Sequence, residues 1–354
     1  MQKQILMKNN ILLLISGLVL LITSCSTEVN INDDWQAIPV VYGILDKNST
    51  EHFIKVNKAF LGDMPASEMA QYSDSLFYNN VDVKLYRKLS NTERQYVCSF
   101  LPTDDYPKED GFFTNDRNTV FKASNVELEA SYGGNLYNYQ LEVYVGDIDK
   151  TVTAETELIT GTYISTPSSS APSISIHSYN NDFYYTYETG TNAKVFQMTI
   201  LFNYLEVTAG DTIEKSIVWP QPAKVINVGN SSVTVQGTFG IMAFYNLLMS
   251  NIPKNENVER IVKMPNSIEF HLTAGDDNFN TYMQISAPPT GLAQSKPLFT
   301  NINNGIGLFA SNINVLKTHK LSAITLDTLH RGMYTSDLNF VEKNHPYYSQ
   351  TSNN

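Results

Sequence analysis

The sequence predicts an all-β protein with two domains. Tyr and Phe number 21 and 17, and β-branched residues recur in short runs. These residue types favour strands, and long stretches with the period of a helix are rare. Positions 25–354, which remain once the N-terminal signal described below is removed, hold 330 residues. A chain of that length is too long to fold around one ordinary hydrophobic core, so we expect two domains.

The first 24 residues have the pattern of a bacterial export signal. Lys3 and Lys8 give a positive start, Ile11–Ile22 form an apolar run, and small residues precede Cys25. This order predicts that residues 1–24 are a signal peptide that is removed. A plain secretory signal and a single membrane anchor are the alternatives, although the run is short for a membrane span, which needs about 20 residues.

Cys25 is the residue through which the sequence predicts a lipid anchor. A cysteine directly after Ile22-Thr23-Ser24 resembles the lipobox of bacterial lipoproteins, which implies that Cys25 becomes the acylated N-terminus. Residues 25–36 then form a polar tether. Its acidic residues partly resemble the surface-export signal of Bacteroidota lipoproteins, and a solvated linker is the alternative. We therefore expect an outer-membrane lipoprotein, on either the periplasmic or the cell-surface face.

The charge balance excludes one class of partner. The chain has 24 basic and 35 acidic residues, for a net charge of −11. Nucleic-acid binding needs a concentrated basic face, so no nucleic acid is expected as a partner. The same balance disfavours adhesion of the folded body to anionic lipid. Membrane attachment is therefore expected from acyl chains on Cys25.

Cys98 has no intramolecular partner if Cys25 is acylated, because the chain holds only these two cysteines. It lies in the apolar, strand-like stretch Gln95–Phe100. We expect a buried and inert thiol. An intermolecular disulfide and a reactive thiol are the alternatives.

The N-terminal domain is expected over residues 37–160. A Pro39-containing strand and an alternating strand form a first hairpin, a helix follows Pro65, and the Gly133-Gly134-Asn135 turn joins two later strands. An acidic loop covers residues 102–118. The expected elements are strands over Ile38–Leu45, His52–Phe60, Val81–Leu89, Arg94–Leu101, Val126–Ala130, Tyr137–Val145 and Lys150–Glu157, and a helix over Ala66–Leu76.

A linker is expected over residues 161–175, because this stretch is small and rich in Pro and Ser. A loop or an ordered strand at the domain edge is the alternative. The C-terminal domain is then expected over residues 176–341, followed by a polar tail over 342–354. It contains one helix, Phe239–Met249, and strands over Phe183–Glu188, Ala193–Thr208, Thr212–Trp219, Ser232–Gly237, Val262–Thr273 with a break at Pro265, Phe279–Ser286, and a closing strand after Asn304–Ala310.

Three sequence blocks together resemble a known family. They are residues 38–45 with 53–61, residues 139–143 with 153–156, and residues 297–309. Their order and spacing resemble a Bacteroidota outer-membrane lipoprotein family that is catalogued only as a domain of unknown function. The resemblance implies an immunoglobulin-like or carboxypeptidase-regulatory-like β-sandwich in the first half. It also implies a TonB-dependent receptor as partner, because such proteins are often encoded beside one, and it supplies no catalytic residues.

Asn304, Gly305 and Gly307 form the most specific part of the third block. They permit positive φ angles and close backbone approach before the chain re-enters a core at Leu308 and Phe309. A bulge or tight corner is expected here. A loop that faces a ligand is the alternative.

An aromatic run offers a second candidate surface. On a strand, Phe183, Tyr185 and Tyr187 share one face and Tyr184 takes the other. We expect one set to pack in the core. The alternative is an exposed stripe formed by Tyr184, Tyr185 and Tyr187 that contacts a sugar, a peptide or a protein.

No recognised catalytic motif, phosphate-binding loop or metal-ligand spacing occurs in the sequence. The Asp276-Asp277 pair is typical of a turn and is weak evidence for calcium. No cofactor or metal is expected. The sequence therefore predicts a non-catalytic lipoprotein that assists or binds a TonB-dependent transporter, with a glycan or a peptide as possible ligand. A structural or adhesive envelope protein and a glycan- or peptide-acting hydrolase are the alternatives.

Overall fold

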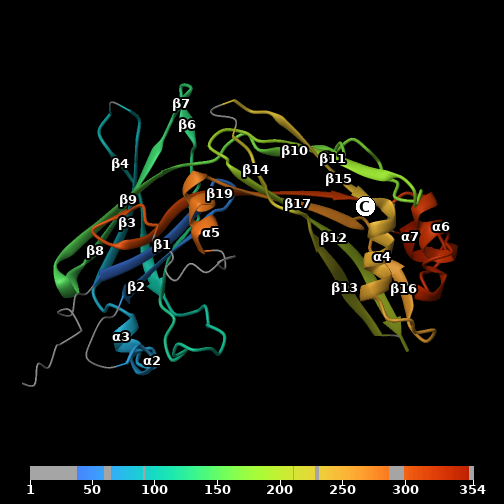
Figure 1. Cartoon of the computed structure of the whole chain (residues 1–354), viewed down its shortest axis with the longest axis horizontal. Helices are drawn as coiled ribbons and strands as arrows, with labels where there is room; N and C mark the ends of the chain where they lie inside the picture. The colour runs from blue at the N-terminus through green and yellow to red at the C-terminus, as the bar shows by residue number, and fades with distance from the viewer. Residues whose placement is uncertain are drawn as a thin grey trace, which may run out of the picture.

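The protein is mostly β, as the sequence predicts. The computed structural model describes residues 38–59, 65–90, 92–209, 211–227, 231–286 and 299–350. These residues form two lobes joined by long strands (Figure 1). A large mixed sheet of 14 strands runs through both, in the order β13-β12-β17-β19-β1-β2-β5-β4-β3-β8-β9-β18, with β14 and β16 also paired to β12.

The first lobe is a layered β structure that encloses its own hydrophobic core. Its longer strands are β1 (Ile38–Asp46), β2 (Glu51–Ala59), β3 (Val81–Lys88), β4 (Gln95–Thr103), β5 (Val120–Ser124), β8 (Asn138–Val145) and β9 (Lys150–Glu157). Its shorter elements are α2 (Ala66–Met69), α3 (Ser73–Leu76), β6 (Ser131–Tyr132), β7 (Asn135–Leu136), η1 (Gly146–Ile148) and β18 (Ile302–Asn303). Alternate residues of these strands face inward, which follows from the two-residue period of a strand.

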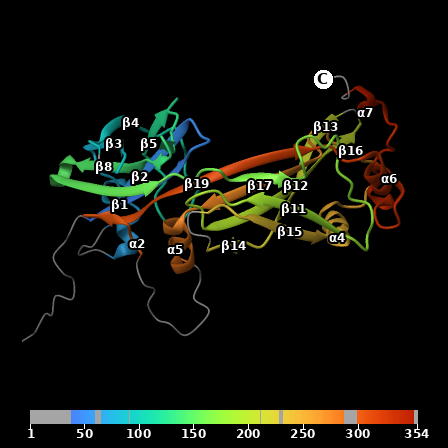
Figure 2. The ribbon, with the colours of Figure 1, turned by 90° about the horizontal axis from the view of Figure 1, so that it is seen from above.

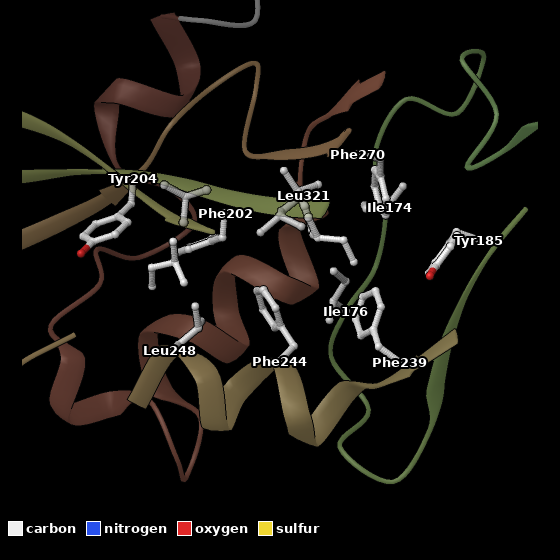
Figure 3. Close-up of a cluster of buried hydrophobic side chains, with 14 of the residues drawn as sticks. Ile174, Ile176, Tyr185, Phe202, Tyr204, Phe239, Phe244, Leu248, Phe270 and Leu321 are labelled. Atoms are coloured by element: carbon white, nitrogen blue, oxygen red, sulfur yellow. The ribbon is translucent and has the colours of Figure 1, made fainter. Parts of the chain in front are cut away.

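The second lobe packs several helices against the far end of the large sheet and against a separate three-stranded sheet, β10-β11-β15. Its strands are β10 (Tyr163–Thr166), β11 (Asp182–Glu188), β12 (Val195–Thr208), β13 (Asp211–Pro220), β14 (Lys224–Val225), β15 (Thr234–Gly240), β16 (Glu259–Val262) and β17 (Ile268–Gly275). The helices are α4 (Ile241–Asn251), α6 (Ala323–Arg331), η2 (Ser336–Leu338) and α7 (Pro346–Gln350). Figure 3 shows the core, where Phe202 of β12 and Phe244 of α4 meet edge to face.

Strand β19 (Ile306–His319) belongs to both lobes. It pairs with β1 in parallel through residues 306–312 and with β17 in antiparallel through residues 312–319. Figure 2 shows it running from one lobe into the other. Its Phe309 is buried in the first core and its Ile313 in the second. The first core is therefore completed by residues that lie far outside 37–160.

A buried polar network lies at this junction. The Asp276 carboxylate accepts hydrogen bonds from the backbone N–H of Ser311 at 2.8 Å and from the Thr156 hydroxyl at 3.0 Å. The Ser311 hydroxyl in turn donates to the Leu45 carbonyl at 3.2 Å and accepts from the Ile159 N–H at 3.1 Å. Burial raises the pKa of Asp276. Asp276 thus helps to join the lobes, whereas the neighbouring Asp277 carboxylate lies 3.9 Å from the Lys194 amine.

The corner at residues 304–307 is present in the structure. Asn304 has φ of 61° and Gly307 has φ of 128°. Gly307 pairs with Val41, and a Cβ at Gly307 would overlap the Val41 carbonyl oxygen. Glycine is required for two reasons. L residues with a side chain rarely adopt this φ, and there is no space for a Cβ at this position.

The prediction of a strand over Phe279–Ser286 is wrong. These residues belong to helix α5 (Asp277–Ser286), whose first turn is capped by the Asp276 carboxylate accepting from the Phe279 N–H at 2.8 Å. Phe279, Tyr282 and Met283 have helical spacing, which the short apolar run concealed. With α6 and α7 also present, the prediction of one helix in this half is wrong as well.

Several boundaries also differ from the expectation. The expected linker contains β10, an edge strand that pairs with β11, as the alternative interpretation anticipated. Part of the expected polar tail forms α7, where Tyr348 is buried in the second core. The helix expected over Ala66–Leu76 is split into α2 and α3.

The Gly133-Gly134 turn is present, with both residues at positive φ as a type I′ hairpin requires.

Cys98 is buried in the first core as a free thiol. Burial raises the pKa of the thiol to about 11. Because the thiolate is the reactive form, we predict that Cys98 does not react with a disulfide reagent at pH 8 in the folded protein and reacts completely once the protein is unfolded. Fast reaction of folded protein would contradict this placement.

Candidate ligand-binding groove

The outer face of β1 and β2 carries a groove made of two adjoining hollows. Their volumes are about 430 Å³ and about 420 Å³, and Tyr42 and Lys55 line both. Volumes of this size are typical of small-molecule sites. On the far side of Tyr42, the ring of Tyr282 from α5 packs edge to face at 6.0 Å.

Strand alternation explains why this face presents large side chains. In β1, Val41 and Leu45 are fully buried in the core, whereas Tyr42 is 39% exposed. In β2, Ile54 is likewise buried, and Lys55 points to the opposite face. The register pairs Tyr42 directly with Lys55, which places the aromatic ring and the amine side by side.

The first hollow has a polar rim. It is lined by Asp46, Ser49, Glu51, Asn312 and Asn314 in addition to strand residues. The Asn314 amide donates to the Asp46 carboxylate at 2.9 Å, and the Asn48 amide donates to the Asn314 carbonyl at 3.1 Å. These bonds fix the turn after β1 against β19, so this end of the groove is preformed.

The second hollow combines apolar walls with cations. Its apolar lining comes from Val40, Leu76, Phe77 and Phe113. The charged residues that line it are Lys55, Lys58 and Lys108. The Lys55 amine lies 4.8 Å from the centre of the Phe77 ring, and the Lys108 amine lies 4.9 Å from the centre of the Phe113 ring. Both distances are within the range of a cation–π contact.

Lys55 is held in place by hydrogen bonds, and its pKa is lowered by its surroundings. Its amine donates to the Asn118 side-chain oxygen at 2.5 Å and to the Thr119 carbonyl at 2.8 Å. Burial, followed by repulsion from Lys108, lowers the pKa of Lys55 to about 8, with Arg117 acting in the same direction and Asp104 opposing it. A half-buried lysine with a lowered pKa in a hollow is typical of a functional site.

Residues 104–118 hold one wall of the groove in place. The Thr114 N–H donates to the Ala70 carbonyl at 2.9 Å, which ties this loop to the segment after α2. The Asn118 amide donates to the Tyr106 carbonyl at 2.7 Å, and Tyr106 packs edge to face on Phe53 at 5.1 Å. The loop is therefore anchored to β2 and to the helices at once.

The candidate residues from the sequence do not line this groove. Tyr185 and Tyr187 are 4% and 2% exposed and lie in the second core, so the proposal that they form a surface stripe is wrong. Tyr184 is 52% exposed on the opposite face of β11. Asn304, Gly305 and Gly307 pack at the corner near β1 and β9. Cys25 lies outside the described residues.

The groove residues were missed because their signal is split between distant segments. Phe53, Lys55 and Asn57 form the outward face of a predicted strand, which shows only that one face is not core. The loop over 102–118 is acidic in composition, yet it turns Lys108 and Phe113 toward Lys55. Lys108 comes close to Lys55 and Lys58 because the loop is bonded to the segment after α2, and the sequence does not display that contact.

Among the residues that the structure describes, no three His, Cys, Asp or Glu side chains come together as a metal-binding group. No helix in the described ranges is long and apolar enough to cross a membrane. No family model matches the chain, and no curated protein was found that matches it.

Proposed function

We propose that the protein is a non-catalytic, lipid-anchored binding protein of the outer membrane that works with a TonB-dependent transporter. The observation that carries the binding role is the groove over β1 and β2. Two hollows that share Tyr42 and Lys55 make a continuous surface with aromatic, cationic and polar parts. Such a surface orients a ligand by its polar groups and holds it by its apolar body.

The second hollow lies apart from the contacts that join the lobes. The groove is on the outer face of the sheet, opposite the first core. Asn312 and Asn314 of the shared strand β19 line the first hollow, but no described residue of β19 and neither Asp276 nor Ser311 lines the second. This position supports a binding role for the second hollow.

The finer domain assignment belongs to the same proposal. We assign an immunoglobulin-like or carboxypeptidase-regulatory-like sandwich to residues 37–160 and a second domain to residues 176–341. Two hydrophobic clusters support this division, since one is built largely from residues 41–158 and the other from residues 159–348. Strand β19 is then a shared element that the second domain contributes to the first.

The anchor and the partner rest on the sequence. The cysteine after Ile22-Thr23-Ser24 supports acylation of Cys25, and the three-block resemblance supports a TonB-dependent transporter as partner. In this arrangement the acyl chains hold the protein at the membrane. We further propose that the transporter covers the groove face.

The anchor is tested by Cys25→Ser, which removes the acylated thiol. We predict that this variant loses fatty-acid labelling and moves from the membrane fraction to the soluble fraction, while Cys98→Ser stays acylated and membrane-bound. Unchanged labelling of Cys25→Ser would contradict the anchor.

The partner is tested by purification of the wild-type protein from native outer membranes in mild detergent. A TonB-dependent receptor in fixed ratio is expected, and recovery of the protein alone would contradict the transporter role.

A further inference from the structure

We propose that the second hollow, between Phe77 and Phe113, binds a small organic carboxylate with an apolar body. Lys55 holds the carboxylate and the two rings hold the body. This inference rests on the proposed binding role of the groove and names the class of its ligand.

Charge is the first argument. Among the residues that the structure describes, the charged side chains that line this hollow are Lys55, Lys58 and Lys108, and no carboxylate lines it. None of these three amines forms an ion pair with a carboxylate in the described part of the chain. Three like charges therefore line one hollow without a direct ion pair, although the Asp104 charge acts on Lys55, in a protein whose net charge is −11. An anion is the ligand that this arrangement favours.

Hydrogen-bonding capacity is the second argument. Lys58 donates to the Asp74 carbonyl at 2.8 Å, and Lys108 has a single long bond of 3.4 Å to the Phe113 carbonyl. An ammonium group has three donors, so Lys55, Lys58 and Lys108 each keep at least one for a ligand.

The walls define the rest of the ligand. Leu76 and Phe77 are buried at 5% and 4% exposure, and Phe113 is 43% exposed at the mouth. A chain or ring that enters between Phe77 and Phe113 gains by leaving water. Because removing a charge from water is costly, a single carboxylate fits this apolar setting better than a dianion such as phosphate.

The test measures octanoate binding to the full chain by titration calorimetry at pH 7, with octanol as the probe that has the same chain and no charge. We expect octanoate to bind at least tenfold more tightly than octanol. Lys55→Met keeps the apolar stem and removes the charge, so it should weaken octanoate binding by about tenfold or more. Lys84→Met, on β3, removes a charge outside both hollows and should leave binding unchanged.

The pH profile gives a readout that a purely structural role would not produce. As pH rises through about 8, Lys55 loses its proton, and octanoate affinity should fall. Lys58 and Lys108 also line the hollow, and Lys108, Arg117 and Asp104 act on Lys55, so the fall is partial. Burial and the Tyr282 contact raise the pKa of Tyr42 to about 12, so its ring stays neutral. The step between pH 7 and pH 9 should disappear in Lys55→Met.

A second variant keeps the test decisive if Lys55→Met does not fold. Phe113→Ala changes a half-exposed loop residue, and we expect it to weaken octanoate binding at least fivefold while thermal unfolding stays as in the wild type. Equal binding of octanoate and octanol, or no binding of millimolar octanoate, would overturn the inference. If that occurs while the transporter still co-purifies, only the ligand class is wrong and the proposed function stands.

Discussion

Replacement of Arg260 by alanine is expected to lower the free energy of unfolding by about 3–5 kcal/mol, the range found when one partner of a buried ion pair is removed. The Arg260 side chain is 1% exposed and lies 3.1 Å from the Glu206 carboxylate. It also donates to the Leu338 carbonyl at 2.7 Å and to the Pro253 carbonyl at 2.9 Å. This side chain of β16 thus contacts β12, the segment after α4 and the last residue of η2.

Alanine leaves the Glu206 charge and two carbonyl groups without these partners in a largely dry site. Urea unfolding followed by circular dichroism measures the loss. The matched control is Lys254→Ala in the same lobe, which breaks a 2.7 Å ion pair with Asp337 whose side chains are 71% and 64% exposed. That control should change stability by less than about 0.5 kcal/mol. Equal losses in both variants would contradict the role given to Arg260.

Gly307→Ala is expected to cost about 3 kcal/mol or more. The φ of 128° is unfavourable for an L residue, and the new methyl group would overlap the Val41 carbonyl oxygen. The chain cannot relax easily, because Gly307 lies within the parallel pairing of β19 with β1, one residue after its start at Ile306. Displacement of β19 would also draw Phe309 out of the first core.

Gly111→Ala is the control for this substitution. Gly111 lies in the loop beside the groove, and the nearest atom to a Cβ there is the Glu109 carbonyl oxygen at 4.0 Å. We expect a change of less than about 0.5 kcal/mol in the midpoint-derived free energy of unfolding. If Gly307→Ala unfolds with the same urea midpoint as wild type, the corner does not hold β19 on β1.

Strand alternation and turn residues allowed much of the first lobe to be predicted. The β1–β2 and β3–β4 hairpins, and the turn at Gly133-Gly134, follow from local signals within a few residues. The helix α4 was recognisable because Ile241, Phe244, Tyr245 and Leu248 repeat with helical spacing. The residues within each of these elements specify it, so it can be predicted without knowledge of contacts to distant parts of the chain.

The remaining elements depend on contacts that the sequence does not display. Helix α5 was mistaken for a strand because its apolar run is short and its cap, Asp276, is read equally well as a turn residue. The parallel pairing of β1 with β19 joins residues more than 260 positions apart. No local pattern specifies such a pairing, because alternation gives a strand its faces and not its neighbours.

The groove was hidden for the same reason. The residues of its second hollow come from β1, β2, α3 and the loop over 104–118, and each segment taken alone has an ordinary explanation. Lys55 lies on an outward strand face, Phe77 follows a short helix, and Lys108 belongs to an acidic loop. Their convergence is a property of the fold. The proposed anchor at Cys25, by contrast, rests on a local sequence pattern that needs no knowledge of the fold.

The central claim is that the groove face is where this protein meets its partner at the membrane. The most direct measurement places a photo-crosslinking amino acid at Tyr42 or at Tyr184 in cells that make the protein, followed by mass spectrometry of the adducts. Both side chains are exposed, at 39% and 52%, and they lie on different lobes. We predict an adduct with an outer-membrane transporter from position 42 and none from position 184. Adducts from position 184 alone, or from neither position, would contradict the claim.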